Sequence, residues 1–164
     1  MLSRWAVRLG LRRIPACVIC SPGGVAATAL IDYLSKNIHV NSSQDSDGLK
    51  HLPTPRMLGS SKVLFISGNP DKVVKSLARR RYLVAQAVKL GGLCVFLLAP
   101  RGEELRNLVL ELIERQEQHF LGRGKNVLIV RGEELYSSGK EIAEFFDIRD
   151  ERFVTGYPIR KLAS

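Results

Sequence analysis

Apolar residues along the chain fall into short continuous runs that alternate with stretches at helical spacing. Residues 16–20, 62–66 and 126–130 are rich in aliphatic and β-branched side chains, the pattern of strands that are buried on both faces. Helical spacing follows over residues 25–34, 71–90, 103–120 and 139–146. Strands that alternate with helices predict an α/β fold with a mainly parallel β-sheet and helices on both faces.

Glycine and proline separate the predicted elements. Ser-Pro-Gly-Gly follows the first strand at residues 21–24, and Ser-Gly-Asn-Pro follows the second at residues 67–70. Residues 37–61 are polar with little periodicity, which predicts a long surface loop. Residues 93–98 are too short to assign by periodicity, and we favour a helical or irregular crossover. Because ligands of parallel sheets bind at the carboxyl ends of the strands, the turns there are the expected site.

The chain has 164 residues, of which 45% are hydrophobic and 25% charged, the balance of one globular domain. We predict a single domain over residues 16–150, with a basic N-terminal arm at residues 1–15 and a C-terminal tail at residues 151–164. The arm holds four arginines and no acidic residue. We interpret it as a lead into the first strand; the alternative is a mitochondrial transit peptide. No apolar run reaches the roughly 18 residues of a membrane span.

Three cysteines cannot form a closed set of disulfides, which favours a reducing compartment and a cytoplasmic location. Cys17 and Cys20 resemble a metal or redox pair only in their spacing. On a strand, positions three apart point to opposite faces. We therefore expect buried strand cysteines and no metal site.

Positive charge is concentrated in the first part of the chain. Residues 1–100 hold 14 Lys and Arg against 4 Asp and Glu, whereas residues 101–164 hold 11 against 12. The imbalance predicts an anionic ligand: a phosphorylated small molecule, a nucleic acid or a membrane surface. The basic part lacks interleaved aromatic residues and any nucleic-acid-binding module, which argues against nucleic acid.

Three segments in the basic part carry candidate chemistry. Glycines at residues 21–28 (Ser-Pro-Gly-Gly-Val-Ala-Ala-Thr) let backbone amides approach a phosphate at a helix N-terminus, although the segment is neither a Walker A sequence nor GxGxxG. A plain tight turn is the alternative. His51 in the long loop is a candidate general base, because a histidine near its unperturbed pKa can take a proton from a hydroxyl at neutral pH; the alternative is that His51 is simply exposed. Ser76 and the arginines at residues 79–81 suit phosphate, unless they form a solvated face.

Taken together, these segments resemble the P-loop sulfotransferase superfamily. Residues 21–30 are similar to its Pro-Lys/Arg-Ser-Gly-Thr-Thr loop, and Lys50-His51-Leu52-Pro53 resembles its Lys-Thr-His-Leu-Pro segment with one residue missing. Residues 68–76 keep the Asn-Pro and the Ser of its Arg-Asn-Pro-x-Asp-x-x-x-Ser element. Residues 127–148 look like the family's late strand, its Tyr-Glu-Asp-Leu turn and the helix that follows. The resemblance covers about residues 16–148.

The resemblance implies a three-layer P-loop-type fold and transfer of a sulfuryl group from 3′-phosphoadenosine 5′-phosphosulfate (PAPS), as cosubstrate, to an acceptor hydroxyl. It implies His51 as the base and Lys50 as a second catalytic residue, with no metal. The acceptor is unknown, because its pocket would come from the variable loop at residues 37–61 and the 91–102 crossover. The nucleotide-binding residues it implies are Ser21, Gly23, Gly24, Val25, Ala26, Ala27, Thr28, Asn69, Ser76, Arg79 and Arg80.

Two cations of the family pattern are absent. Glycine (Gly23 or Gly24, depending on the register) stands where the loop has Lys or Arg, and Gly68 stands where the family has an Arg for the 3′-phosphate. Lys50, Lys72 or one of the arginines at residues 79–81 could substitute. The alternative function is therefore a catalytically inactive nucleotide-binding or protein-interaction module, with the amphipathic helix at residues 103–120 as its partner surface if its apolar face is exposed.

Overall fold

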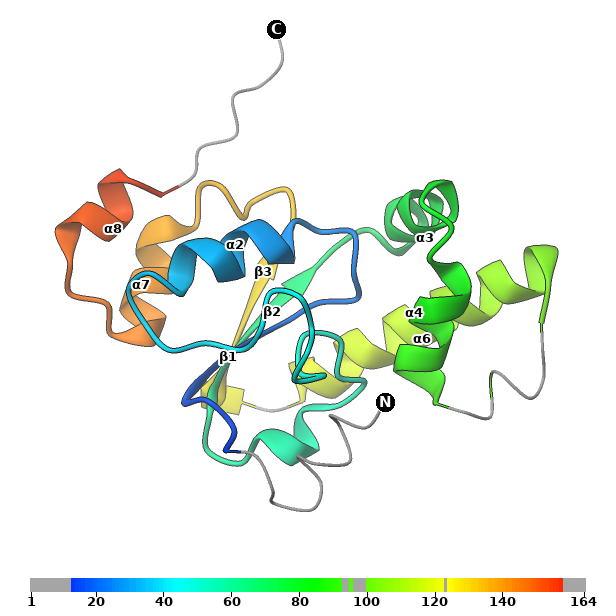
Figure 1. The fold of residues 1–164 in the computed structure, drawn as a ribbon, viewed down its shortest axis with the longest axis horizontal. Coiled ribbons are helices and arrows are strands. Elements are labelled where there is room, and N and C mark those ends of the chain that lie inside the picture. The colour runs from blue at the N-terminus through cyan, green and yellow to red at the C-terminus, as the bar shows by residue number, and fades with distance from the viewer. Residues whose placement is uncertain (1–12, 93–94, 96–99, 123, 158–164) are drawn as a thin grey trace, which may run out of the picture.

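A computed structural model describes residues 13–92, 95, 100–122 and 124–157. Strands β1 (Cys17–Cys20), β2 (Lys62–Ser67) and β3 (Val127–Arg131) form a parallel sheet in the order β1-β2-β3 (Figure 1). The predicted strands and the α/β class are confirmed. Most of the N-terminal arm, most of the 93–98 crossover and the last residues of the tail lie outside the described residues.

Helices follow the strands as the periodicity predicts, with one exception described below. The helices predicted over residues 25–34, 103–120 and 139–146 are α2 (Ala27–Leu34), α6 (Gly102–Leu121) and α7 (Gly139–Phe146). Short 3-10 turns, η1 (Pro55–Leu58) and η2 (Gly124–Asn126), precede β2 and β3. A further helix, α8 (Glu151–Thr155), lies in the segment expected as a tail. Its Phe153 is buried, so this part of the tail contributes to the core.

The single helix predicted over residues 71–90 is wrong: the segment forms two helices, α3 (Pro70–Arg79) and α4 (Leu83–Gly91). Between them Arg81 has a left-handed backbone, with a φ of 60°. The Tyr82 amide donates back to the Leu77 carbonyl at 2.9 Å, which closes the end of α3. No glycine or proline marks this break, and the apolar positions continue through it, so periodicity alone predicts one helix.

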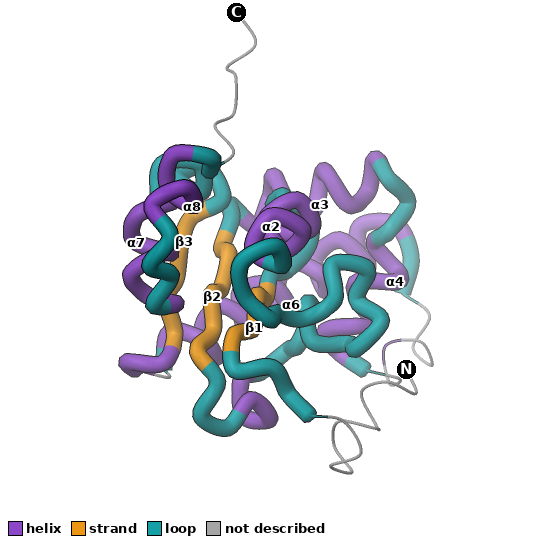
Figure 2. The backbone as a smooth tube through the Cα atoms, turned by 60° about the vertical axis from the view of Figure 1, so that its left-hand side comes forward, coloured by secondary structure: helices purple, strands orange, loops and turns teal. Residues whose placement is uncertain are grey.

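Helices α2, α7 and α8 cover one face of the sheet (Figures 1 and 2). The sheet contributes side chains such as Ile19, Leu64 and Val130 to this core, and the helices contribute side chains such as Ile31 and Ile142. These residues are almost fully removed from water, and burial of large aliphatic side chains of this kind contributes most of the stability of a small domain.

The opposite face of the sheet is covered by the long loop and by the end of α6. Leu49 and Leu52 of the loop pack there with Phe65 of β2, whose ring stacks on Phe120 of α6 with centroids 4.4 Å apart. Cys17 packs on the first face and Cys20 on this one, as expected from their spacing. Helix α6 also buries its apolar face against α3 and α4, so the partner surface suggested for residues 103–120 is already covered.

Residues 37–61 form the expected loop, which runs along the free edge of β1. The Asn41 side chain accepts a hydrogen bond from the Ile19 amide at 2.7 Å and donates to the Ile19 carbonyl at 3.0 Å. Farther along, the Ser21 amide donates to the Lys50 carbonyl at 2.9 Å. Because side-chain and backbone groups of the loop take the place of a neighbouring strand, the edge of β1 is paired. This pairing brings Lys50 and His51 to the carboxyl end of β1.

Substitution of Asn41 by alanine is expected to lower the free energy of unfolding by about 2 to 3 kcal/mol. Asn41 is 2% exposed, and its removal leaves the buried amide and carbonyl of Ile19 without partners. Chemical denaturation of Asn41→Ala measures the change, and Asn37→Ala is the control because Asn37 is exposed on the same loop. Equal stability of the two variants would contradict the pairing.

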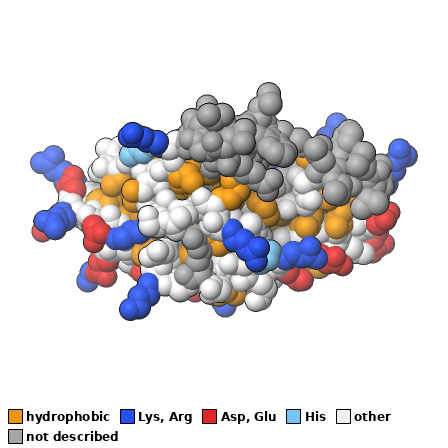
Figure 3. Space-filling model, turned by 90° about the horizontal axis from the view of Figure 1, so that it is seen from below, with side chains coloured by type: hydrophobic (Ala, Val, Ile, Leu, Met, Phe, Trp, Pro, Cys, Tyr) orange, Lys and Arg blue, Asp and Glu red, His pale blue; other side chains and the backbone are white. Residues whose placement is uncertain are grey.

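Charged side chains on one face of the molecule are mixed. Figure 3 shows basic and acidic side chains interspersed among the described residues of that face, rather than gathered in a continuous basic stripe. Of the helices in the described part of the chain, none has the length and apolar character needed to span a membrane. Four basic side chains, Lys50, Arg79, Arg80 and Lys89, come together at the cavity described next.

Candidate functional site

A cavity of about 670 Å³ lies at the carboxyl end of β1, between the turn that follows this strand, the long loop, and helices α3 and α4. It brings together residues that are far apart in the sequence. All of the predicted site residues except Val25 and Asn69 line it: Ser21, Gly23, Gly24, Ala26, Ala27, Thr28, Lys50, His51, Ser76, Arg79 and Arg80.

The turn after β1 has the backbone shape of an anion-binding loop. Gly23 and Gly24 both have left-handed backbones, with φ of 94° and 76°, and Ala26 follows with φ of 59° before α2 begins. Side chains rarely adopt this conformation, which explains why glycine occupies two of the three positions. In anion-binding loops, left-handed residues in succession bring backbone N–H groups to one concave side. Here the turn leads into the positive end of the α2 dipole, and the Gly23 amide donates to Ser21 Oγ at 3.3 Å. The arrangement suits a phosphate or sulfate oxygen.

His51 is buried beside this turn rather than exposed. Its Nδ1 lies 2.9 Å from the Ser21 carbonyl oxygen, and a carbonyl can only accept, so Nδ1 carries the proton and Nε2 the lone pair. Burial lowers the pKa of His51 from 6.5 to about 4, against the opposing effect of the Ser21 hydrogen bond. The imidazole is therefore neutral at pH 7, which is the protonation state of a general base, although its lowered pKa makes it a weaker proton acceptor than a solvated histidine.

This burial predicts that stability falls in acid. Between pH 6.5 and about 4 the unfolded chain binds a proton at His51 and the folded chain does not. The free energy of unfolding therefore decreases as the pH falls through this window, by at most roughly 3 kcal/mol. Denaturation at pH 7 and pH 5 should give a smaller pH dependence for His51→Asn than for wild type. His119→Asn is the control, because His119 is exposed; equal pH dependence in all three proteins would contradict the assignment.

Lys50 joins the loop to the start of α2. Its ammonium donates to Thr28 Oγ1 at 2.6 Å and to the Ser43 carbonyl at 2.7 Å. Burial lowers the pKa of Lys50, against the attraction of Asp45, whose carboxylate also contacts Lys89 at 2.6 Å. Because Thr28 Oγ1 accepts from Lys50, its own O–H proton remains available to donate to an anion on the turn.

The Arg80 guanidinium lies beside Gly24, one of the two glycines that stand where the resemblance implies a Lys or Arg. Its Nη2 lies 3.1 Å from the position that a Cβ on Gly24 would take, and Ser76 Oγ lies 3.6 Å from the same position. Arg80 Nε donates to the Ser76 carbonyl at 3.2 Å, which holds the guanidinium at the end of α3. A guanidinium has five donors in a planar fork, so the remaining donors of Arg80 can serve an anion seated on the turn.

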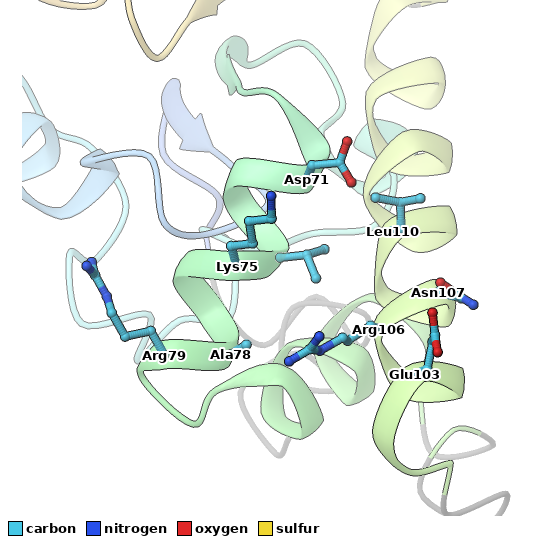
Figure 4. Close-up of a pocket in the computed structure, with 9 residues that line it drawn as sticks. Asp71, Lys75, Ala78, Arg79, Glu103, Arg106, Asn107 and Leu110 are labelled. Carbon is cyan, nitrogen blue, oxygen red and sulfur yellow. The ribbon is translucent and has the colours of Figure 1, made fainter.

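Arg79 lies on the ridge between this cavity and a second one. A groove of about 490 Å³ between α3 and α6 is lined by Lys75 and Arg79 from α3 and by Glu103 and Arg106 from α6, among others. In Figure 4 the Arg79 side chain points away from α6, whereas Arg106 lies between the two helices. The lining of this groove mixes acids and bases on exposed helix surfaces, which does not favour an anion.

The two remaining predicted residues, Val25 and Asn69, line an adjoining pocket of about 420 Å³ together with Gly68, Lys72 and Tyr136. Asn69 caps α3, because its side chain accepts a hydrogen bond from the Lys72 amide at 3.1 Å. Gly68 is packed against Val25, so a side chain there would collide with it. Gly24 and Ala26 line both pockets, which makes the turn the shared wall of the two.

One wall of the main cavity was not predicted. Helix α4 and the residue before it contribute Tyr82, Ala85, Gln86 and Lys89, at the i, i+3, i+4 and i+7 spacing of a single helical face. This spacing can be seen in the sequence. The break at Arg81, which turns this face of α4 toward Gly23, cannot be seen there. The other two histidines, His39 and His119, are exposed.

Comparisons of the chain with protein-family models, with curated proteins and with solved structures gave no match. Within the described ranges, no three His, Cys, Asp or Glu side chains are grouped so that they could share a metal ion. The site is defined by its own geometry: a cavity with a glycine turn, a buried neutral imidazole and an arginine at the end of a helix.

Proposed function

We propose that the chain binds PAPS in the main cavity and transfers its sulfuryl group to an acceptor hydroxyl, leaving adenosine 3′,5′-bisphosphate (PAP). The proposal includes the P-loop-type, three-layer arrangement implied by the sequence resemblance. The observation that carries it is the convergence of three distant segments on one cavity: the turn after β1, the Lys50-His51 pair and the end of α3. These are the segments through which the family binds and activates its donor.

The residues present can supply the chemistry of this reaction. The acceptor oxygen attacks the sulfur of PAPS as the hydroxyl proton moves to Nε2 of His51, and the bond from sulfur to the bridging oxygen of the 5′-phosphate breaks. The leaving group is then the phosphate of PAP. The amides of the glycine turn, the Thr28 hydroxyl and the Arg80 guanidinium are the donors that would stabilise the charge developing on that phosphate. His51 is neutral, as the step requires.

Ser76 and Lys72 provide the contacts for the second phosphate, whereas Arg80 serves the phosphate on the turn. The Ser76 side chain lines the cavity one helical turn before Arg80, on the same side of α3. Lys72 lies in the adjoining pocket next to Gly68, where the family has an arginine. A nucleotide that extends from the main cavity past Gly24 into the adjoining pocket would contact Ser76, Arg80 and Lys72.

Substitution of Ser76 by alanine is expected to weaken PAP binding about five- to tenfold, since one hydrogen bond to a charged phosphate is lost. Adenosine 5′-monophosphate, which lacks the 3′-phosphate, should bind equally well to the variant and to wild type. Isothermal calorimetry measures both affinities, with Ser60→Ala as an exposed control. An equal loss of affinity for both nucleotides would contradict the assignment of Ser76 to the 3′-phosphate.

The second candidate function is nucleotide binding without catalysis. The glycine in place of the loop cation favours it, because in the family that side chain lies on the loop itself, whereas Arg80 reaches the turn from α3. The two functions are distinguished by incubation of wild type and His51→Asn with PAPS labelled in its sulfuryl group and a panel of hydroxyl acceptors. Label transferred by wild type and not by the variant supports the enzyme; PAP binding without transfer supports the inactive module.

A further inference from the structure

Gln86 is a buried polar side chain in the α4 wall of the main cavity. It is 4% exposed and lines the cavity beside the glycine turn. In the described structure its amide nitrogen, Nε2, is shielded from solvent and has no hydrogen-bond partner. A buried amide group left without a partner destabilises the folded protein.

The Gln86 amide faces the glycine turn next to His51. Its Oε1 lies 3.3 Å from the position that a Cβ on Gly23 would take, and His51 Cε1 lies 3.6 Å from the same position. The amide and the imidazole therefore converge on the side of Gly23 from which a side chain would project. Rotation about the last side-chain torsion exchanges Oε1 and Nε2, a broad two-fold torsion with little preference between its two positions. After this rotation Nε2 faces the turn and can donate to a group bound there, and Oε1 takes the place that Nε2 has in the described structure.

We infer that Gln86 donates a hydrogen bond to an oxygen of the sulfuryl group of bound PAPS, an inference that rests on the proposed function. A sulfuryl group offers only acceptor oxygens, and the Nε2 amide is a donor. The acceptor hydroxyl, by contrast, must give its proton to His51. A group beside both Gly23 and His51 lies where the transferred group would be, between the phosphate on the turn and the attacking hydroxyl. Gln86 then recognises the donor PAPS in preference to the product PAP, which has no sulfuryl group.

The test compares the affinities of wild type and Gln86→Leu for PAPS and for PAP by calorimetry, with no acceptor present. We expect PAPS to bind the variant about tenfold more weakly, as for loss of one hydrogen bond to an anion, and PAP to bind within twofold of wild type. The ratio of the two dissociation constants is the readout, since a purely structural role would change both affinities together. Gln86→Met, which keeps an unbranched side chain, should give the same ratio.

The outcomes separate this inference from the proposed function. A wild-type protein that binds both nucleotides, with a ratio unchanged in Gln86→Leu, overturns the role of Gln86 alone. Equal weakening of both nucleotides in Gln86→Leu and Gln86→Met also overturns it, because the side chain would then act by holding the turn. A wild-type protein that binds neither nucleotide overturns the proposed function and this inference with it.

Discussion

Arg80→Gln is expected to slow sulfuryl transfer by about 100- to 1000-fold and to weaken PAP binding about tenfold. Arg80 is the cation whose guanidinium lies against the Gly24 turn, where the sequence lacks the loop cation of the family it resembles. A preorganised donor at a developing negative charge stabilises the transition state more than the ground state. Loss of the Arg80 guanidinium should therefore lower the transfer rate more than the affinity. Steady-state transfer of labelled sulfuryl and calorimetry with PAP measure the two effects.

Arg81 offers a matched control one residue away. It is exposed, has a left-handed backbone and does not line the cavity. Arg81→Gln removes the same charge at the neighbouring position. Both rate and affinity should stay within about twofold of wild type, because solvent screens an exposed charge that does not contact the ligand. If Arg81→Gln lost as much activity as Arg80→Gln, a general effect of positive charge, and not a contact at Gly24, would be at work.

His51→Asn should reduce transfer by about 100- to 10 000-fold while PAP affinity stays within about twofold. The asparagine amide can replace Nδ1 as the donor to the Ser21 carbonyl. The substitution removes Nε2, the atom that accepts the proton in the proposed step. His119→Asn is the control for loss of an exposed histidine. Full activity in His51→Asn would exclude His51 as the base.

The pH dependence of transfer follows from the same residue. Because burial lowers the pKa of His51 to about 4, the imidazole stays neutral from about pH 5 upward, and the acid limb of the rate profile should fall near pH 4. Asp45, Lys50 and Lys89 face His51 with charges of both signs. A limb near the ordinary histidine value of 6.5 would show that the residue is more solvated in the working protein than in this structure.

The strands and most helices follow from local patterns. Residues 16–20, 62–66 and 126–130 read as buried strands because aliphatic side chains fill successive positions, and each forms a parallel strand within a residue or so of the expected bounds. The break between α3 and α4 could not be predicted in this way. Arg81 adopts its left-handed backbone although it is not glycine, and the hydrogen bond from Tyr82 to Leu77 that closes α3 leaves no mark on the apolar pattern.

The site depends on contacts that join distant parts of the chain. The sequence could suggest His51 as a base, but its burial and the direction of its lone pair come from the packing of the long loop on β1, where Asn41 pairs with the strand edge 22 positions away. Likewise, the sequence could show only that Gly23 or Gly24 stands where the resemblance implies a Lys or Arg. That Arg80 fills the space depends on how α3 leaves the sheet.

The side chains of α4 illustrate the same limit. Gln86 is polar and follows apolar and small residues in the sequence, so it carries no signal of a site by itself. Its position against Gly23 arises only because the α3–α4 break turns the helix toward the cavity. The residues that α4 contributes to the cavity could therefore not be predicted, because nothing in the sequence marks the break before this helix.

Calorimetric titration of the wild-type protein with PAP and, separately, with adenosine 5′-monophosphate tests the central claim most directly. We expect saturable binding of PAP with a stoichiometry of one, at an affinity at least about tenfold tighter than that of the monophosphate, because Ser76 and Lys72 add contacts to a second phosphate. No detectable binding of PAP at millimolar concentration, or equal affinity for the two nucleotides, would contradict it.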